Sequence, residues 1–236
     1  MGSHEAKAQA EETISVSEAA RHLSLSPSTI RRAAEELHAV RVDGRWHLRV
    51  CDLEEWIARG RPPAELLAEP VGYPGSEPSL HPYLDVRNII LDAPQTEARL
   101  LIRAAFRQAR IVLRDGPGLH GTETLSARIC RSVLEREALS STAFHPDVAY
   151  PHPNDAGRHL LGANQIIVIR ALHAVDFNDA YGHRPRIVFV LLTQSISIQL
   201  LWEARLSYLV HRESLVSRLL LAPTASAVFD LFAPER

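Results

Sequence analysis

The chain has 236 residues, of which 46% are hydrophobic, and a formal net charge of −2 at pH 7. This length suits two small domains or one large domain, and the hydrophobic fraction supports a sizeable core. The near-neutral charge excludes a polyanion-binding surface spread over the whole chain, so any nucleic-acid contact must come from a local patch.

Cysteine usage and hydropathy indicate where the protein works. The two cysteines, Cys51 and Cys130, lie far apart and form neither a CxxC site nor a disulfide framework. No apolar run approaches the roughly 18 residues that a membrane helix needs, and the N-terminus lacks a signal-peptide pattern. We therefore expect a protein of the reducing cytoplasm that does not contact a membrane.

The first organised segment begins with two short amphipathic helices, expected over residues 18–23 and 27–37. They are separated by a polar break of about three residues, which is typical of a helix-turn-helix. Serines stand where helix N-caps are needed, at Ser15 or Ser17 for the first helix and at Ser26 for the second.

A β-hairpin is expected next, with strands over residues 40–42 and 45–50. Its turn is Asp43-Gly44, a pair that favours the tight turns of hairpins. Asp52 is expected to cap a last helix over residues 53–58. The apolar side of that helix carries Leu53, Trp56 and Ile57.

In this order the four elements resemble the winged helix-turn-helix of the excisionase/MerR-like family. The resemblance covers residues 16–23, 26–32, 41–48 and 52–57. It implies that the second helix enters the major groove of DNA and that the wing touches the backbone. Base or phosphate contacts would come from Ser28, Thr29, Arg31 and Arg32, and wing contacts from Arg41, Arg45 and Arg49.

The same segment carries about as many acids as arginines, so a protein-interaction module is the alternative to a DNA-binding one. On the DNA-binding interpretation, the acidic side chains are expected on the face turned away from DNA. These are Glu35, Glu36, Glu54 and Glu55.

The rest of the chain predicts a linker and a second domain. Residues 61–82 are rich in proline and predict a semi-stiff linker between a domain at 13–60 and one at 83–236. Helices are expected over 96–110, 121–137, 200–210, 214–221 and 225–232, and strands over 165–170 and 186–192. Helices that alternate with buried strands predict an α/β fold, a mixed β-sheet flanked by helices.

One motif in this second domain holds a histidine between two prolines, Pro151-His152-Pro153. Together with the preceding Arg136-Glu137 pair and Thr142, it resembles the enzyme IIA domain of the sugar phosphotransferase system, of the fructose/mannitol and nitrogen-regulatory type. Val175-Asp176-Phe177 and the strand and helix that follow also fit this family.

The resemblance implies a phosphoryl relay in which His152 accepts the group from a histidine-containing phosphocarrier protein. A neutral imidazole offers a nitrogen lone pair near neutral pH. Phosphoryl transfer needs mainly positioning and charge compensation, which Arg136 would supply as a bidentate clamp. Thr142 would donate a hydroxyl hydrogen bond.

The sequence departs from the family at one site position. A second histidine usually begins the helix after the long strand, and here Gln199 stands in its place. Glutamine donates a hydrogen bond but carries no charge and shuttles no proton. This favours a receiver of the phosphoryl group over a relay. Asp155, three residues after His152, either repels a phosphoryl group or lies in a solvated turn.

A metal site is the competing interpretation of the histidines. His145, His152 and His159 are spaced by seven, but prolines interrupt the helical register and no cysteine joins them. We therefore expect neither a metal nor a cofactor.

Together these patterns predict a homodimeric, DNA-binding transcription regulator that senses the phosphotransferase system through His152. The alternatives are an enzyme IIA-like interaction module that is not phosphorylated, and a phosphocarrier component that passes its group to a membrane permease. Whether the protein is an enzyme stays open.

Overall fold

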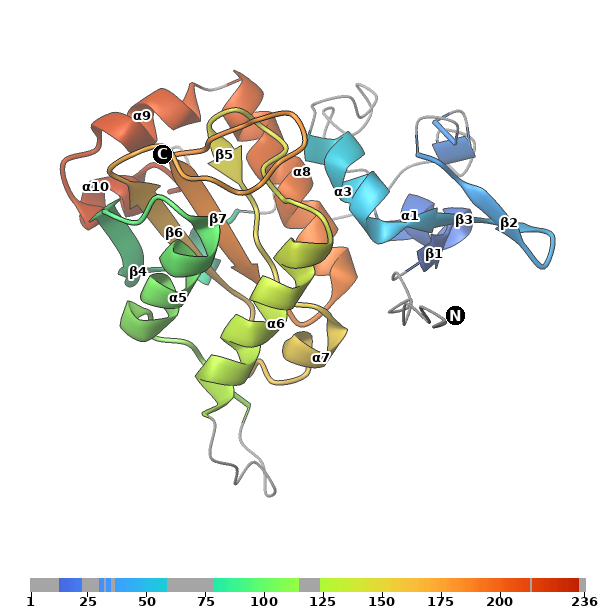
Figure 1. The fold of residues 1–236 in the computed structure, drawn as a ribbon, viewed down its shortest axis with the longest axis horizontal. Coiled ribbons are helices and arrows are strands. Elements are labelled where there is room, and N and C mark those ends of the chain that lie inside the picture. The colour runs from blue at the N-terminus through green and yellow to red at the C-terminus, as the bar shows by residue number, and fades with distance from the viewer. Residues whose placement is uncertain are drawn as a thin grey trace, which may run out of the picture.

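The computed structural model describes residues 13–22, 30–31, 33–34, 37–58, 79–114, 124–212 and 214–233. A small N-terminal unit lies beside a larger α/β unit, and helix α3 of the first contacts helix α8 of the second (Figure 1). In these ranges no helix combines the length and apolar character needed to cross a membrane.

The N-terminal unit is a three-stranded antiparallel sheet with helices packed on it. Its elements are β1 (Thr13–Ser15), α1 (Val16–His22), β2 (Val40–Val42), β3 (Arg45–Arg49) and α3 (Val50–Ala58). The predicted hairpin is confirmed, since β2 pairs with β3 around Asp43 and Gly44. Both turn residues have positive φ, 48° and 76°, as a type I′ turn requires.

Two details of this unit differ from the prediction. Strand β1 was not predicted, because three residues are too few to show an alternating pattern; it pairs with the far edge of β3. The last helix begins at Val50, and Asp52 does not cap it. Both carboxylate oxygens of Asp52 instead accept hydrogen bonds of 2.7 Å from Arg49.

The first helix is capped through a reciprocal pair of hydrogen bonds. Ser15 Oγ accepts the backbone N–H of Glu18 at 3.2 Å, and the Glu18 carboxylate accepts the backbone N–H of Ser15 at 3.0 Å. This capping box satisfies two donors that the helix itself leaves without partners. Of the two serines considered for this cap, Ser15 is therefore the one used.

The larger unit has a mixed four-stranded sheet. Its elements are η1 (His81–Tyr83), β4 (Leu84–Ala93), α5 (Ala98–Gln108), α6 (Leu125–Leu139), β5 (Val148–Ala149), α7 (Asp155–Arg158), β6 (Gln165–Ala171), β7 (Ile187–Leu192), α8 (Ile196–Arg212), α9 (Leu215–Leu221) and α10 (Ala225–Asp230). The strand order is β4-β6-β7-β5, with β6 and β7 antiparallel and the outer pairs parallel. The predicted α/β fold with a mixed sheet is confirmed.

The two central strands, β6 and β7, are buried along their whole length because helices cover both faces of the sheet (Figure 1). Along β7, Phe189 and Leu191 pack with α8, α9 and α10, whereas Val188 and Val190 pack with α5 and α6. This alternation follows from the two-residue period of a strand. Continuous apolar runs such as 187–192 therefore belong to strands buried on both faces.

The first strand of this sheet, β4, was not predicted. It is an edge strand, it carries exposed Arg87 on its outer side, and its register with β6 shifts twice. Such a strand shows neither a clean alternation nor an apolar run. Leu80, within the predicted linker, is buried in the core that the sheet forms with α8.

The short helix α7 packs tightly against α6 through Gly157. A Cβ atom on this residue would lie 2.1 Å from Ser132 Oγ and 2.8 Å from Pro153 Cβ. Ser132 Oγ also accepts the backbone N–H of Asn154 at 3.0 Å, so this contact holds the loop that follows the Pro-His motif.

We therefore predict that Gly157→Ala lowers the free energy of unfolding by about 1–3 kcal/mol, because the added methyl group over-packs this contact. Chemical denaturation of the purified variant measures the change. Ala156→Ser, at the exposed neighbouring position, is the control and should unfold like the wild type. Equal stability of Gly157→Ala and wild type would contradict the packing seen here.

Candidate functional site

The site is built around His152, which is 1% exposed and lies in the loop after β5. Two backbone hydrogen bonds fix the two residues that precede His152 in this loop. The Pro151 carbonyl accepts the Leu191 N–H of β7 at 2.8 Å, and the Tyr150 N–H donates to the Thr142 carbonyl at 3.2 Å. The ring is thereby held at the edge of the sheet.

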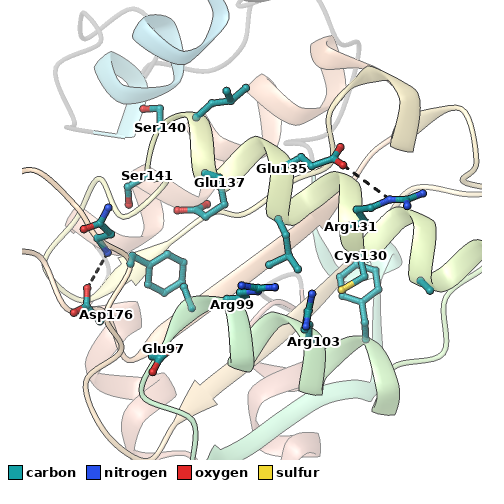
Figure 2. Close-up of a pocket in the computed structure, with 18 of the residues that line it drawn as sticks. Glu97, Arg99, Arg103, Cys130, Arg131, Glu135, Glu137, Ser140, Ser141 and Asp176 are labelled. Carbon is teal, nitrogen blue, oxygen red and sulfur yellow. Dashed lines mark hydrogen bonds and ion pairs between the residues drawn. The ribbon is translucent and has the colours of Figure 1, made fainter. Parts of the chain in front are cut away.

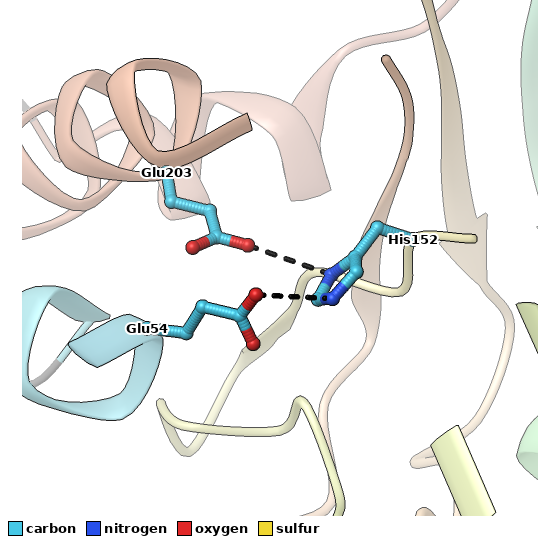
Figure 3. A group of neighbouring side chains, drawn as sticks. All are labelled: Glu54, His152 and Glu203. Carbon is cyan, nitrogen blue, oxygen red and sulfur yellow. Dashed lines mark ion pairs between the residues drawn. The ribbon is translucent and has the colours of Figure 1, made fainter. Parts of the chain in front are cut away.

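Both ring nitrogens of His152 face oxygen atoms. Nδ1 lies 3.0 Å from the Tyr150 carbonyl oxygen and 3.5 Å from Glu203 of α8. Nε2 lies 3.2 Å from Oε1 of Glu54, a residue of α3 in the N-terminal unit. Figure 3 shows Glu54 and Glu203 reaching the ring from two different helices. The site is therefore composed of residues from both units.

Glu54 is fully buried, and two further groups donate hydrogen bonds to it. The Arg136 guanidinium pairs with its Oε2, and the Gln199 side-chain amide donates to its Oε1. Arg136 is itself held by the Ser140 carbonyl at 2.9 Å. The Glu54 carboxylate thus contacts a guanidinium, an amide and an imidazole.

A second layer orients Gln199. Its amide nitrogen also donates to Glu203 Oε1 at 3.0 Å, and its amide oxygen accepts a hydrogen bond from Arg158. Arg158 is 2% exposed and also donates to Thr193 Oγ1 at 2.7 Å. Arg158 therefore brings a second buried guanidinium next to Gln199.

The pKa values of the two buried glutamates are shifted in opposite directions. Burial alone raises the pKa of the Glu54 carboxyl, but the charges and hydrogen bonds of His152 and Arg136 outweigh it and hold the pKa well below its usual range. Burial raises the pKa of the Glu203 carboxyl well above its usual range, and the charge of Glu54 adds to this. These shifts favour the ionised form of Glu54 and the protonated form of Glu203.

The proton of the His152–Glu54 contact belongs on the imidazole. Burial lowers the pKa of His152 from its ordinary value, and the charge of Glu54 offsets only part of that shift. Since Nδ1 faces a carbonyl and Nε2 faces an ionised carboxylate, the geometry favours a proton on each nitrogen. In this arrangement Nε2 has no lone pair available for a reaction.

The structure brings three of the predicted phosphoryl-site residues together, namely His152, Arg136 and Gln199. The fourth, Thr142, directs its hydroxyl at Glu137 Oε2, 2.6 Å away, and its N–H at the other oxygen, 2.9 Å away. It thereby fixes the end of α6 beside Arg136. Asp155 is exposed and 3.6 Å from His159, as expected of a solvated turn.

Three residues of the site were not predicted: Glu54, Arg158 and Glu203. Glu54 had been placed on a face of the N-terminal unit turned away from DNA, where a charged side chain looks like any solvated one. Arg158 follows His152 by six residues and had no motif to mark it. Glu203 follows Gln199 by four residues, so both lie on one face of α8, and this spacing was the available signal.

Among the described residues, Glu54, His152 and Glu203 are grouped closely enough to be considered as metal ligands. Their surroundings suit an anion better. Glu54 already pairs with the Arg136 guanidinium, the raised pKa of Glu203 favours its protonated form, and His152 Nδ1 is directed at a carbonyl. In the part of the chain that the structure describes, His145 and His159 are not grouped with His152 as metal ligands, and the His145 ring instead packs edge-to-face against His211.

The predicted DNA contacts are only partly described. Arg31, Arg41 and Arg45 are exposed, and the Arg41 guanidinium lies 4.9 Å from the ring centre of Trp46. Ser28, Thr29 and Arg32 lie outside the described residues.

A separate cleft of about 1170 Å³ lies between α5 and α6 (Figure 2). Arg99, Arg103 and Arg131 line it together with carboxylates such as Glu97 and Glu135. Because both signs of charge are present, its lining does not select one class of ligand.

We predict from the raised pKa of Glu203 that replacing it with glutamine stabilises the protein at neutral pH. As the pH rises above about 4.3, the unfolded chain releases this proton while the folded chain keeps it, so the wild type loses stability. The side chain of the Glu203→Gln variant does not titrate, so the variant does not lose stability in this way. Its melting temperature should match the wild type near pH 4 and exceed it at pH 7.

A gain of about 1 kcal/mol corresponds to roughly 2–4 °C for a protein of this size. The control is Glu135→Gln, whose carboxylate is 53% exposed, and which should melt like the wild type at both pH values. A lower melting temperature of Glu203→Gln at pH 7 would show that Glu203 is ionised in the folded protein.

Comparisons with known families identify two parts of the chain. Residues 120–234 match the family model "Phosphoenolpyruvate-dependent sugar phosphotransferase system, EIIA 2", and residues 13–61 match "Helix-turn-helix domain". No curated protein matches the chain.

Solved structures support the fold of the larger unit. The nitrogen regulatory protein IIA-Ntr from Neisseria meningitidis has a TM-score of 0.53 at 21% identity, over 65% of this chain and 98% of that one. IIA mannitol from Escherichia coli has a TM-score of 0.50 at 19% identity, over 63% and 98%. The IIA mannitol chain in a complex with phosphorylated IIB mannitol, also from Escherichia coli, has a TM-score of 0.50 at 19% identity, over 63% and 95%.

At these identities the solved structures show the fold, and the family models identify the two parts. The chain joins a helix-turn-helix domain at residues 13–61 to a domain of the EIIA 2 family of the phosphoenolpyruvate-dependent sugar phosphotransferase system at residues 120–234.

Proposed function

We propose that the protein is a cytoplasmic transcription regulator that binds DNA through its helix-turn-helix domain and senses the phosphotransferase system through phosphorylation of His152. The observation that carries this proposal is the set of donors around His152 Nε2. Arg136 and Gln199 both direct hydrogen bonds to the anion that lies against this nitrogen. A phosphoryl group on Nε2 needs such donors.

The reacting nitrogen follows from the hydrogen bonding of the ring. When the imidazole is neutral and Nε2 is free of the Glu54 carboxylate, an Nδ1–H that donates to the Tyr150 carbonyl, 3.0 Å away, leaves the lone pair on Nε2. This lone pair attacks the phosphorus of a phosphohistidine on the donor protein. The new N–P bond forms as the donor N–P bond breaks, and the electron pair returns to the donor imidazole.

The charge at the site favours receiving the group over passing it on. Arg136 and Arg158 compensate the negative charge of a phosphoryl group, and Gln199 donates a hydrogen bond. Neither an arginine nor a glutamine returns a proton to a leaving imidazole, because arginine stays protonated and glutamine does not titrate. The phosphorylated state should therefore persist, as a sensor requires.

The partners belong to the same proposal. The phosphoryl donor is a histidine-containing phosphocarrier protein. One similar EIIA chain was solved with a phosphorylated IIB protein, which makes a IIB-like protein a second candidate. Exposed Arg31, Arg41 and Arg45 suit contacts to DNA. A homodimer would place two such units on half-sites about one helical turn, roughly 34 Å, apart.

The burial of His152 favours a second candidate function, that of an EIIA-like interaction module that is never phosphorylated. A histidine that is 1% exposed cannot meet a phosphocarrier without a rearrangement. The experiments that follow separate the two candidates.

We predict that incubation with the general phosphotransferase proteins and labelled phosphoenolpyruvate gives acid-labile label on the wild type and none on His152→Ala. Arg136→Gln should reduce the initial rate of labelling at least about tenfold, because a charged hydrogen bond to the phosphoryl group is lost. His159→Ala, at an exposed histidine seven residues on, is the control and should label like the wild type. Absence of label on the wild type would leave the interaction module as the function.

For DNA binding, we predict that Arg31→Ala and Arg41→Ala weaken binding to sites selected from a random DNA pool and lower its salt dependence. Each lost phosphate contact should reduce the slope of log affinity against log salt by roughly 1. Arg184→Ala, in the EIIA domain, is the control with matched charge. Unchanged affinity of both arginine variants would remove the proposed recognition helix and wing from the interface.

A further inference from the structure

We infer that the helix-turn-helix domain is itself the resident ligand of the His152 site, with Glu54 held where a phosphoryl group would be held. This inference rests on the proposed phosphorylation of His152 and adds its regulation. The Glu54 carboxylate takes the hydrogen bonds of Arg136 and Gln199 and lies 3.2 Å from Nε2. Carboxylate and phosphoryl oxygens accept from the same donors, so one can replace the other.

The two anions cannot occupy the site together. Glu54 and His152 are both buried, and their contact distance is that of a hydrogen bond, which leaves no room for phosphorus and its oxygens. A phosphoryl group also brings a charge of about −1.5 to −2 against the ionised carboxylate. Phosphorylation of His152 and docking of α3 are therefore mutually exclusive.

Docked Glu54 also blocks the chemistry at the reacting nitrogen. The lowered pKa of Glu54 keeps the carboxylate ionised and the contact proton on Nε2, where the lone pair is needed for attack. Undocking removes the carboxylate and lets Nε2 lose this proton to water. The contact thus inhibits phosphorylation through both access and protonation.

Apart from the contacts of Glu54 with Arg136 and His152, the contact between the domains is mainly apolar. Leu200 of α8 is fully buried in the hydrophobic core of the helix-turn-helix domain, with Ile196 and Ala204 packed beside it. Ser207 Oγ donates to the Ile57 carbonyl at 3.0 Å. These contacts place α3 at the site. The Glu54 carboxylate then occupies the position where Arg136 and Gln199 bind an anion.

The occupant is the domain of the same chain. Residues 59–78 join Ala58 of α3 to the EIIA domain, and 20 residues span at most about 70 Å. A tethered ligand meets its site at an effective concentration in the millimolar range, which favours it over a free competitor. A second copy that supplies its own Glu54 is the alternative occupant.

The first test compares initial rates of His152 labelling by the general phosphotransferase proteins. Glu54→Ala should be labelled about tenfold faster than the wild type or more, since a loss of about 1.4 kcal/mol of docking free energy gives a factor of ten. Glu54→Gln, which keeps the shape but not the charge, should fall between them. Asp43→Asn, in the exposed hairpin turn of the same domain, is the control and should equal the wild type.

The second test weakens the apolar contact between the domains and leaves Glu54, Arg136 and His152 unchanged. Ala204→Arg places a long side chain against the apolar patch and should also accelerate labelling. Amide hydrogen exchange of α3 reports docking directly. Exchange should rise in Glu54→Ala, in Ala204→Arg and in the phosphorylated wild type, but not in Asp43→Asn. Mixing wild type with Glu54→Ala at increasing concentration shows whether a second copy supplies the blocking carboxylate.

The outcomes separate the inference from the function on which it rests. Label on the wild type, with equal rates and equal α3 exchange in Glu54→Ala, overturns the inference and leaves His152 phosphorylation standing. No label on any variant overturns the proposed function and the inference with it. Blocking that depends on protein concentration overturns the same-chain occupant.

Discussion

A buried carboxylate needs hydrogen bonds and charges from the protein to replace those it made with water. The arrangement of the two domains depends on how Glu54 obtains them. The penalty for burying one ion is several kcal/mol even after the surroundings relax. Glu54 recovers it from Arg136, Gln199 and His152, all of which belong to the other domain. The orientation of α3 against the EIIA domain therefore depends on this cluster as well as on the apolar contact at Leu200.

The same cluster explains the unusual residue at the site. A glutamine has both a donor and an acceptor, and Gln199 uses both, toward the two glutamates on one side and Arg158 on the other. A histidine at this position would bring a second titrating ring between two carboxyl groups. Gln199 instead connects fixed charges without adding one, so the state of the site is set by the anion that occupies it.

Much of the fold followed from the sequence, because its strongest signals are local. Strands buried on both faces, such as β7, appear as apolar runs, and Asp43-Gly44 specifies its turn through backbone conformation alone. The edge strand β4 lacks such a pattern, since one side of it is exposed and its register shifts. It could be recognised only from its partner strand.

The site was predictable to the extent that its residues form a contiguous motif. His152 and Arg136 could be identified from the Pro-His and Arg-Glu patterns, whereas Glu54 lies in another domain and its burial depends on how the domains meet. A glutamate on a helix face looks the same whether it faces water or a buried arginine. Arg158 was missed for the same reason: its role comes from contacts with Thr193 and Gln199, distant in sequence.

The burial of Leu200 among residues of the helix-turn-helix domain ties the folding of the two domains together. A unit that ends at Ala58 and begins at Thr13 has fewer than 50 residues, close to the size below which a hydrophobic core alone is marginal. Docked, it should unfold together with the EIIA domain, because Leu200 belongs to its core. Undocked, it must rely on its own small core, so DNA, as a ligand of the folded state alone, becomes its next source of stability.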